Sequence, residues 1–485
     1  MELSSIIQSL ENKLFINNKY VDGTSGQLLT VTDPATGETV SSRVANAGQT
    51  DLDKAVAAAE ATMKLDSPWR TMTTMERSQL LWKAADLLEQ KMHMHYISLL
   101  EARSFGGPYS LHRTIDIKAA ADNLRFGVIR SPETTNCVMV ACLAWSGASH
   151  LALLWLSWPR MARNLYLALD TEFLCWAVMI ADTSQISSAG MKLGPALAAG
   201  NCMILKPSEK TPLGTLYLGR IFAEAGFPPG VIQVLSGDGK LGSLLAHHEK
   251  IRKISFTGSV GVGKKIQEAA TKTNLKRVTL ELGGKSPIIV CKDAALENAA
   301  FWAAVAITSN SGQYCVAGSR VYVHRDVVDE FRALYHAKLT ELASGKGSQV
   351  ISQRHTGPLQ TKFNMTGLYI APTVFESPSE VVAIYRQEIF GPVLVMKTYT
   401  TEEEVIRMAN ATEFGLMASV FTSNVDCAAR MVEALEAGTV CVNTSMAISY
   451  KAPFGGQKQS GYGSEGGLDS VLAYTQVKTV AQQLI

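Results

Sequence analysis

The sequence predicts an α/β protein with two parallel-sheet domains, and three observations support this prediction. Strand-like and helix-like segments alternate at short spacing from about residue 200 to 295, and a second alternation follows from 294 to 444. The chain has 485 residues, which is too long for one simple core and suits two or three domains. Its composition, 47% hydrophobic and 18% charged, is that of a globular protein and excludes a disordered or fibrous one.

The N-terminal part precedes these alternating units and is predicted to form strands and then helices. Residues 14–47 contain short extended pieces divided by turn residues such as Asp22-Gly23, so a strand-rich opening is expected. From 50 to 103 the pattern becomes helical. Thr73 and Glu76 have the spacing of a capping box, which predicts that a helix begins there.

The two alternating units supply the predicted sheets. In the first unit the expected strands are NCMILK, GVIQVLSG, KISFTG, RVTLEL and SPIIVCK, separated by helices. In the second unit the expected strands are RVYVH, VLVMKTY, ASVFTS and GTVCVNT, and the expected helices are 294–308, 326–343, 402–409 and 425–437. Repeated strand–helix–strand units of this kind place parallel strands in one sheet with helices on both faces.

One segment, 137–186, does not match its surroundings. It contains four of the seven tryptophans and three of the eight cysteines, and it shows neither a clean helical nor a clean strand period. Residues 137–159 are apolar enough to raise the question of a membrane span. His150 and three serines interrupt this run and no charged flank precedes it, so we expect no membrane span.

Charge and cysteine content exclude several function classes. With 45 basic and 43 acidic residues the net charge is +2, so the sequence shows no excess of positive charge for binding nucleic acid. The eight cysteines show no CxxC or Cys/His spacing, so neither a disulfide framework nor a metal site is expected. The N-terminus lacks the features of a signal or transit peptide, and the expected location is therefore cytoplasmic.

Two motifs suit a nucleotide. The loop FTGSVGVG, residues 256–263, follows a predicted strand and opens a predicted helix, where free N–H groups and the helix dipole favour a phosphate. Its glycine spacing departs from GxGxxG, and an ordinary strand-to-helix turn explains it equally well. Lys206 and Glu209 of KPSE lie at the end of a strand, where a carboxylate can accept from ribose hydroxyls. Taken alone, KPSE is more simply a solvated charge pair.

Two further residues suit covalent chemistry. Cys315 lies in SNSGQYCVAGSR among small and polar neighbours, a context typical of a nucleophile, although a buried inert thiol is the commoner fate of a single cysteine. Glu281 ends an apolar strand in VTLELGGKSP. A carboxyl group in such surroundings has a raised pKa and can act as a general base, whereas a strand-end glutamate that points into water is an equally good interpretation.

Six motifs in this order resemble those of the aldehyde dehydrogenase superfamily: KPSEKTP, FTGSVGVG, ELGGKSP, GQYCVAGSR, QEIFGPV and PFGGQKQSGYGSEGG. The resemblance covers about 14–126 and 190–485. It implies two Rossmann-like domains, one for the cofactor and one for catalysis, with a small β element for oligomerisation. The implied boundaries are 1–281 for the NAD-binding domain, 282–450 for the catalytic cysteine domain, and 451–485 for a return to the cofactor domain that ends in an oligomerisation strand.

The resemblance also implies an activity, the NAD(P)-dependent oxidation of an aldehyde to a carboxylic acid in a homo-oligomer. Cys315 matches the catalytic cysteine, whose thiolate attacks the aldehyde carbon to give a thiohemiacetal that passes hydride to nicotinamide and becomes a thioester. Glu281 matches the general base that activates water to hydrolyse the thioester. The implied partner is a small-molecule aldehyde, and no metal, nucleic acid or membrane is implied.

The resemblance assigns the cofactor contacts residue by residue. The matched positions are Lys206 and Glu209 for the adenosine ribose, Gly258, Ser259 and Gly263 for the pyrophosphate, Leu282 beside the nicotinamide, Glu388 and Phe390 for the nicotinamide ribose, and Lys192 with Glu465 for a proton relay from the base. A carboxylate at the ribose repels a 2′-phosphate, so NAD is expected rather than NADP.

Two departures from the family pattern bear on activity. The resemblance is lost across 127–189, where family members have a strand, an oligomerisation hairpin and a PWNFP-like motif, so we expect the fold to be disrupted there. The motif's asparagine contributes to the oxyanion hole, and neither Asn136 nor Asn164 has the flanking residues to replace it. The segment reflects either true divergence or a coding sequence read through an intron or out of frame, and its abrupt edges favour the second. The catalytic domain is also shortened at 346–369.

The missing asparagine leaves other functions open. Losing one oxyanion donor typically costs roughly 100- to 1000-fold in turnover. The alternative to the dehydrogenase is therefore a catalytically impaired or dead homologue that still binds nucleotide. A further alternative is ester hydrolysis without a cofactor through Cys315 and Glu281.

Overall fold

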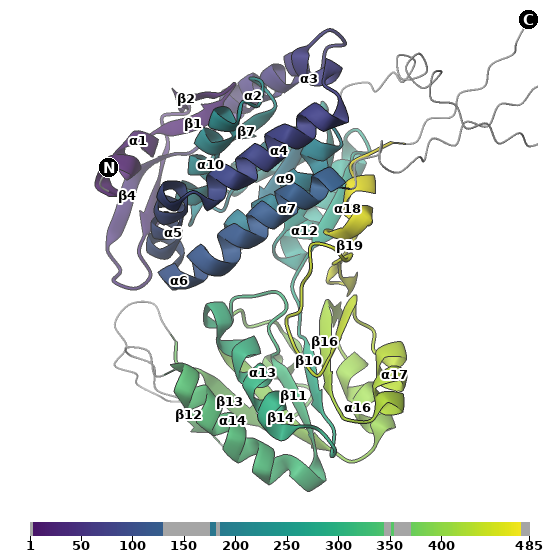
Figure 1. The fold of residues 1–485 in the computed structure, drawn as a ribbon. Coiled ribbons are helices and arrows are strands. Elements are labelled where there is room, and N and C mark those ends of the chain that lie inside the picture. The colour runs from purple at the N-terminus through teal and green to yellow at the C-terminus, as the bar shows by residue number, and fades with distance from the viewer. Residues whose placement is uncertain (1–2, 130–174, 181–184, 344–350, 354–369, 477–485) are drawn as a thin grey trace, which may run out of the picture.

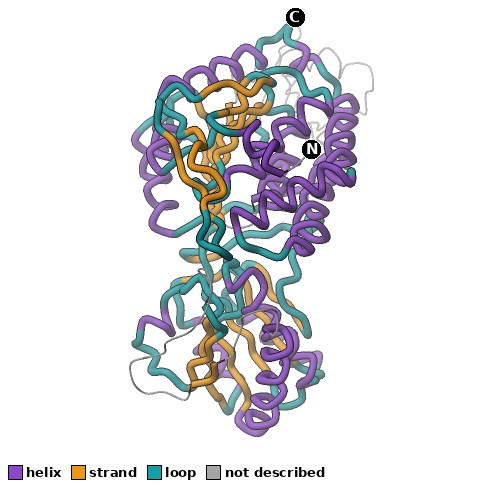
Figure 2. The backbone as a smooth tube through the Cα atoms, turned by 90° about the vertical axis from the view of Figure 1, so that its left-hand side faces the viewer, coloured by secondary structure: helices purple, strands orange, loops and turns teal. Residues whose placement is uncertain are grey.

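The structure, a computed structural model, describes residues 3–129, 175–180, 185–343, 351–353 and 370–476 and has two lobes (Figure 1). Within these residues the upper lobe is built on an eight-stranded sheet and the lower lobe on a seven-stranded sheet. Figure 2 shows helices on both sides of the strands in the upper lobe. The predicted α/β class with two mainly parallel sheets is confirmed.

The N-terminal segment is rich in strands, as predicted. Its elements are α1 (Leu3–Leu10), β1 (Lys13–Ile16), β2 (Lys19–Asp22), β3 (Leu28–Thr32) and β4 (Thr39–Ala45). β1 pairs antiparallel with β2 and extends the main sheet of the upper lobe, whereas β3 and β4 form a separate two-stranded ribbon.

Helices follow along the chain in the upper lobe (Figure 1). They are α2 (Gln49–Thr62), α3 (Pro68–Thr71), α4 (Thr74–Glu89), α5 (Lys91–Phe105), α6 (Tyr109–Leu111), the π-helix η1 (His112–Asp116) and α7 (Ile117–Ile129). The predicted capping box is confirmed. The hydroxyl of Thr73 accepts from the N–H of Glu76 at 3.3 Å, and the Glu76 carboxylate accepts from the N–H of Thr73 at 2.7 Å.

The upper sheet has the strand order β19-β9-β8-β5-β6-β7-β1-β2, in which the run from β9 to β7 is parallel. Its strands and helices after the N-terminal part are β5 (Cys175–Ile180), α9 (Gln185–Ala198), β6 (Cys202–Lys206), α10 (Pro212–Ala225), β7 (Ile232–Val234), α11 (Gly239–His247), β8 (Ile251–Thr257), α12 (Val260–Lys272), β9 (Arg277–Glu281) and β19 (Gly461–Tyr462). β6 and β7 are buried along their whole length, as expected for strands covered on both faces.

The expected disruption across 127–189 does not interrupt this sheet. Strand β5 lies between β6 and β8 and is parallel to both, so the prediction that the segment breaks the fold is wrong for these residues. The run CWAVMI is apolar without alternation, which suits a central strand but carries no period by which it could be recognised. Residues 130–174 and 181–184 lie outside the described residues, and with them the apolar run 137–159, Asn136 and Asn164.

The lower sheet is parallel throughout, with the order β12-β13-β14-β11-β10-β16-β17. Its strands are β10 (Pro287–Val290), β11 (Arg320–His324), β12 (Ile351–Gln353), β13 (Thr373–Glu376), β14 (Val393–Tyr399), β16 (Met417–Phe421) and β17 (Thr439–Val442). Its helices are α13 (Leu296–Thr308), the 3₁₀ helices η3 (Ser309–Gly312) and η4 (Arg325–Val327), α14 (Val328–Ala343), α15 (Ala383–Arg386), α16 (Glu402–Asn410) and α17 (Val425–Ala434). Of the segment predicted to be shortened, 346–369, only 351–353 is described, as the edge strand β12.

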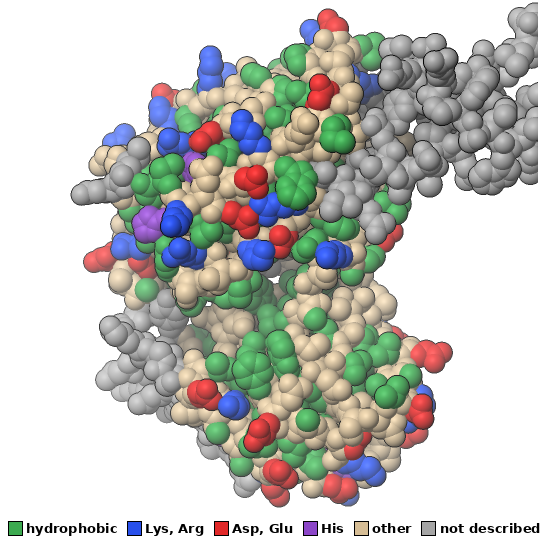
Figure 3. Space-filling model, viewed as in Figure 1, with side chains coloured by type: hydrophobic (Ala, Val, Ile, Leu, Met, Phe, Trp, Pro, Cys, Tyr) green, Lys and Arg blue, Asp and Glu red, His purple; other side chains and the backbone are tan. Residues whose placement is uncertain are grey.

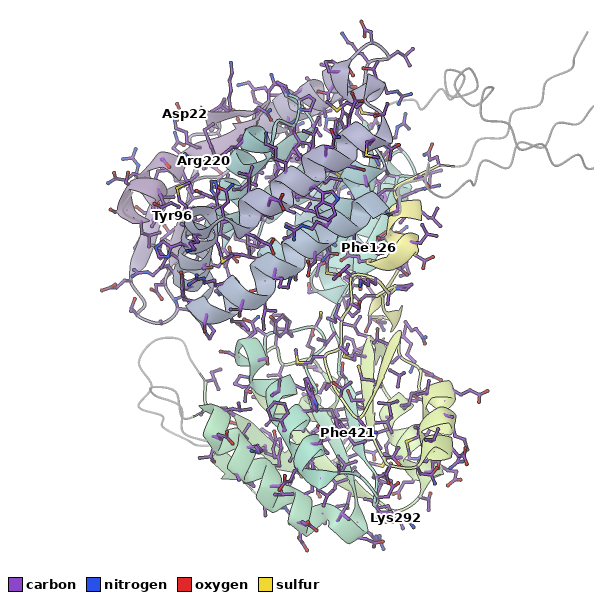
Figure 4. All side chains as sticks on the ribbon, in the orientation of Figure 1. Asp22, Tyr96, Phe126, Arg220, Lys292 and Phe421 are labelled. Carbon is purple, nitrogen blue, oxygen red and sulfur yellow. The ribbon has the colours of Figure 1, made fainter. Side chains whose placement is uncertain are left out.

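Within the described ranges the chain passes between the lobes twice. The first crossing, 282–286, joins the end of β9 directly to the start of β10. The second crossing returns after β17; it contains β18 (Gln457–Lys458), which pairs with β15 (Phe414–Gly415), and it continues through β19, which pairs with β9, to α18 (Gly467–Leu472). On this return path Tyr450 contacts Phe126 near the end of α7, with ring centroids 5.6 Å apart (Figure 4).

The two sheets meet at the waist through different ends of their strands. β9 ends at the first crossing and β10 begins there, and Lys292, just after β10, lies at the outer end of the lower lobe (Figure 4). The carboxyl edge of the upper parallel strands therefore faces the amino edge of the lower ones. Ligands of open α/β sheets bind at the carboxyl edge, so the waist between the lobes is the expected place for a site.

Candidate functional site

Cys315 lies at this waist, in the loop between η3 and β11. It is half-buried and packs with Met191, Tyr314 and Met446 around a small apolar cluster. The loop is tight: Gly312 has a φ of 71°, and a Cβ added there would lie 2.2 Å from the carbonyl oxygen of Gly391. The backbone before the cysteine therefore requires glycine, because a side chain would push the 388–393 loop away.

The first crossing contacts the cysteine directly. A Cβ added to Gly284 would lie 2.3 Å from the carbonyl oxygen of Cys315. The ELGGKSP motif, which carries Glu281, and the GQYCVAGSR motif therefore meet in space, although 34 positions separate Glu281 from Cys315 in the sequence.

Glu281 is the last residue of β9 and is only 3% exposed, so the interpretation of a strand-end glutamate in water is wrong. Within the described part of the chain neither carboxylate oxygen has a hydrogen-bond partner. Burial raises the pKa of Glu281 well above its ordinary value, the charge of Glu465 raises it further, and Lys192 opposes both. A buried carboxyl group with a raised pKa suits a general base.

Lys192 and Glu465 form a buried ion pair next to this carboxyl group. The ammonium of Lys192, on α9, donates to the Glu465 carboxylate and, at 2.9 Å, to the hydroxyl of Ser255. Ser255 in turn donates to Glu465 at 3.2 Å. The backbone of Glu465 is held by two bonds to Phe454, at 2.6 and 2.7 Å. The structure thus brings Glu281, Lys192 and Glu465 together.

Sequence reasoning missed the residues that continue this polar group along the sheet. Lys253, two positions before Ser255 on β8, donates to the hydroxyl of Thr279 at 2.5 Å, and its ammonium lies 5.2 Å from the ring centroid of Tyr474. Burial, with the charges of Lys192 and Arg277, lowers the pKa of Lys253 to about 7, while Glu465 opposes the shift. Polar residues at alternating positions of two buried strands are the signal that could have revealed them.

The glycine-rich loop lies between Glu281 and α12. The N–H of Gly258 donates to the carbonyl of Glu281 at 3.0 Å, and Ser259 is the N-cap of α12. Among the described residues no side chain caps this 13-residue helix at its first turn, which suits an anion there. A Cβ on Gly263 would lie 2.9 Å from Leu282, so Leu282 packs closely onto the first turn of the helix.

Lys206 and Glu209 occupy the end of β6 on the same sheet edge. Lys206 is buried and donates to the carbonyl of Pro207 at 2.9 Å, and its ammonium lies 3.9 Å from the Glu209 carboxylate. Burial lowers the pKa of Lys206, and Glu209 and Asp238 oppose this shift. A solvated charge pair is therefore the wrong interpretation for the lysine, whereas the Glu209 side chain is 46% exposed and accessible.

Glu388 and Phe390 lie on the lower side of the waist. The Glu388 carboxylate accepts from the N–H of Gly284 at 3.0 Å, and a Cβ on Gly283 would lie 2.1 Å from its other oxygen. Phe390 has a φ of 57°. Both residues line a small cavity together with Gly284 and Tyr314, so the loops of Glu281, Cys315 and Glu388 converge.

The position of the missing oxyanion asparagine, shortly before Lys192, lies outside the described residues. In the ranges that are described, no three His, Cys, Asp or Glu side chains are grouped so that they could hold a metal ion. No helix in these ranges is both long and apolar enough to span a membrane. Acidic and basic side chains are interspersed over both lobes on the face shown in Figure 3.

Comparison with known proteins gives consistent matches over almost the whole chain. A sequence profile described as the aldehyde dehydrogenase family matches residues 20–138, 185–365 and 357–480. The unmatched stretch, 139–184, falls within the segment where the resemblance was expected to be lost. The chain is 38% identical to aldehyde dehydrogenase 1A1 of Gallus gallus, covering 96% of this chain and 92% of the relative. It is 36% identical to human retinaldehyde dehydrogenase 3, covering 99% and 94%.

Solved structures agree with these relatives. The aldehyde dehydrogenase KauB from Pseudomonas aeruginosa superposes with a TM-score of 0.83 at 32% identity, covering 98% of both chains. An NAD⁺ complex of an aldehyde dehydrogenase from Bacillus cereus superposes with a TM-score of 0.82 at 33% identity, covering 98% of this chain and 97% of that one.

Proposed function

Because the chain belongs to the aldehyde dehydrogenase family, we propose that it oxidises an aldehyde to a carboxylic acid with NAD, through a thiohemiacetal and a thioester on Cys315. The observation that carries this proposal is the contact between the crossing segment 282–286 and the backbone of Cys315. It places the loop of Glu281, a buried carboxyl group with no hydrogen-bond partner in the described ranges, against the loop of a half-buried thiol.

The upper side of the waist fits a dinucleotide. We infer that the residues that hold it are Lys206, Glu209, Gly258, Ser259, Gly263, Leu282, Glu388 and Phe390. The uncapped first turn of α12 suits a pyrophosphate, and Gly263 leaves room there that a Cβ would fill. When bound, NAD supplies the hydride acceptor. The accessible carboxylate of Glu209 disfavours a 2′-phosphate, which supports NAD over NADP, as do the NAD⁺ complexes of related structures.

The protein's own groups perform the covalent and proton-transfer steps. The Cys315 thiolate attacks the aldehyde carbon and later carries the acyl group as a thioester. Glu281 takes a proton from the thiol, and afterwards one from the water that attacks the thioester and releases the acid. The Lys192–Glu465 ion pair lies next to Glu281 and is placed to receive that proton.

The remaining assignments are part of the same proposal. Residues 1–281 with 451–485 form the NAD-binding unit, and 282–450 form the catalytic unit. The substrate is a small-molecule aldehyde, the location is cytoplasmic, and the protein is a homo-oligomer that pairs through its C-terminal strand.

Absorbance of NADH at 340 nm tests the proposal. We expect turnover of one or more aldehydes from a panel of short and aromatic compounds, with a loss of at least about 1000-fold in Cys315→Ala, since removing a covalent nucleophile has effects of this order or larger. Cys427→Ala is the matched control, because Cys427 is also half-buried in the lower lobe but lies on α17. Equal rates in Cys315→Ala and the unsubstituted protein would overturn the proposal.

One observation favours a second candidate function. The family's oxyanion asparagine has no counterpart in the sequence before KLGPALAAGN. A folded protein that binds NAD, as measured by fluorescence quenching, but forms no NADH from any aldehyde would support a nucleotide-binding homologue without dehydrogenase activity. Ester hydrolysis that is indifferent to NAD and lost in Cys315→Ala would instead support hydrolysis without a cofactor.

A further inference from the structure

The crossing segment contains a second buried ionisable residue that the proposed function does not use. Lys285 precedes β10 and is 1% exposed, and in the described part of the chain its ammonium has no hydrogen-bond partner. Burial and the neighbouring charge of Arg320 lower the pKa of Lys285 to about 8, and Glu388 opposes the shift. At neutral pH the side chain is therefore still mostly protonated, and it carries a buried charge.

Arg320 adds a second buried positive charge. It opens β11, where it lies opposite Pro287 of β10, and it is also 1% exposed. Its guanidinium donates only to neutral acceptors, which are the carbonyls of Lys285 at 2.7 Å, Met408 at 3.2 Å and Ala409 at 2.8 Å, and the hydroxyl of Tyr322 at 3.2 Å. Among the described residues neither cation forms an ion pair, and Glu388 acts on Lys285 through its charge without a hydrogen bond. Two buried charges of the same sign are costly when no carboxylate pairs directly with either of them.

A cavity adjoins both cations at the amino edge of the lower sheet. Lys285, Ser286 and Arg320 line it, together with the end of α16, strand β15, the start of β16 and the residues that directly follow α17. The hydroxyl of Ser286, which is 5% exposed, also has no partner within the described residues. Glu436, the acidic residue of the lining, is exposed and pairs with Lys458. The space accommodates an occupant of about the size of one water molecule.

We propose that this cavity binds a monatomic anion of the chloride class, held by the ammonium of Lys285 and the hydroxyl of Ser286 and stabilised by the charge of Arg320. An anion supplies both the hydrogen-bond acceptor that these two groups lack within the described residues and a negative charge next to the two cations. Of the common anions a monatomic halide is the closest in size to this space, and phosphate and sulfate exceed it by more. A water molecule fits but leaves the charge uncompensated. The site does not rest on the proposed dehydrogenase activity.

Thermal unfolding at constant ionic strength tests the site, with sodium gluconate exchanged stepwise for sodium chloride. A ligand that binds only the folded state stabilises it in a saturable way. We expect the midpoint of the unsubstituted protein to rise by about 2–4 °C and then level off. Lys285→Met, which removes the charge and keeps the length, should show no chloride-dependent rise.

Lys276→Met is the matched control. Lys276 is also a buried lysine, but its ammonium donates to the carbonyl of Ala246 and the hydroxyl of Thr273. This variant should keep the full chloride response. Equal responses in Lys285→Met and the unsubstituted protein would overturn the proposal, as would an equal rise with phosphate or sulfate.

Anomalous diffraction from crystals of the unsubstituted protein grown in bromide tests the site even if Lys285→Met does not fold. We expect an anomalous bromide peak within about 3.5 Å of the Lys285 ammonium nitrogen. Density there without an anomalous signal would identify water and overturn the anion.

Discussion

The two sheet edges that meet at the waist bury their charges in opposite ways. On the upper edge the Lys192–Glu465 ion pair lies beside Glu281, so charges of both signs are present and polar groups connect them. On the lower edge, within the part of the chain that the structure describes, buried Arg320 donates to neutral acceptors and buried Lys285 has no acceptor. Only four positions separate Glu281 from Lys285. From this difference we expect the upper network, which contains both signs of charge, to transfer protons and the lower pair of cations to bind an anion.

Glu281→Gln is the strongest test of the upper edge. The amide is nearly isosteric but cannot accept a proton, and a general base contributes roughly 10²- to 10⁴-fold, so NADH formation should fall by that factor. Because the pKa of Glu281 is raised, activity of the unsubstituted protein should increase with pH as the carboxyl group ionises, and this rise should disappear in the variant.

The control for this variant is Glu413→Gln, an exposed glutamate in the lower lobe. It should leave both the rate and its pH dependence unchanged. An unchanged pH profile in Glu281→Gln would show that another group is the base. A thermal midpoint close to that of the unsubstituted protein would establish that the loss is chemical, since in the described structure neither carboxylate oxygen is hydrogen-bonded.

Lys192→Met removes the positive charge of the Lys192–Glu465 ion pair. It leaves Glu465 buried without its cation, and removing one partner of a buried pair typically costs about 3–5 kcal/mol. We expect this loss in the free energy of unfolding, measured by urea denaturation. Lys192→Met with Glu465→Gln should recover most of it, because no buried charge of the pair then remains. A double variant no more stable than Lys192→Met would contradict the ion-pair account.

Much of the architecture could be predicted because the relevant signals are local. The capping box at Thr73 and the alternating strands and helices depend on neighbouring residues, and their positions agree with the structure. Strand β5 could not be recognised, since an apolar run without alternation is ambiguous until β6 and β8 flank it. β12 and β13 were missed for a related reason, because they are short edge-side strands of three and four residues.

The sequence likewise indicated only some residues of the candidate site. Motif resemblance indicated Cys315, Glu281 and the nucleotide loop. It could not indicate which polar residues of β8 and β9 adjoin Glu465, because that contact depends on the return of the chain from the lower lobe. Nor could it reveal that Lys285 is buried with no hydrogen-bond partner among the described residues. The sequence shows that lysine as one more charged residue of a loop.

The smallest expected effect is on the pH dependence of the free energy of unfolding. It compares Lys253 in the upper lobe with Lys285 in the lower lobe. In the folded state the pKa of Lys253 is lowered to about 7, while in the unfolded chain it is near 10.4. Between these values the unfolded chain binds more protons, so the free energy of unfolding contributed by this group rises with pH, by at most about 1.4 kcal/mol per pH unit. Below pH 7 both states are protonated and this dependence vanishes.

Lys253→Met should therefore show a smaller increase in stability between pH 7 and 9 than the unsubstituted protein, measured by urea denaturation. Lys285→Met should also lower this increase, since its pKa is lowered to about 8. Chloride separates the two lysines. An anion beside Lys285 favours the charged ammonium and reduces its contribution to the slope, whereas Lys253, which is bonded to Thr279 and influenced by Glu465, should give the same slope with and without chloride. If chloride alters the contribution of Lys253 as much as that of Lys285, the two edges do not differ in the way proposed.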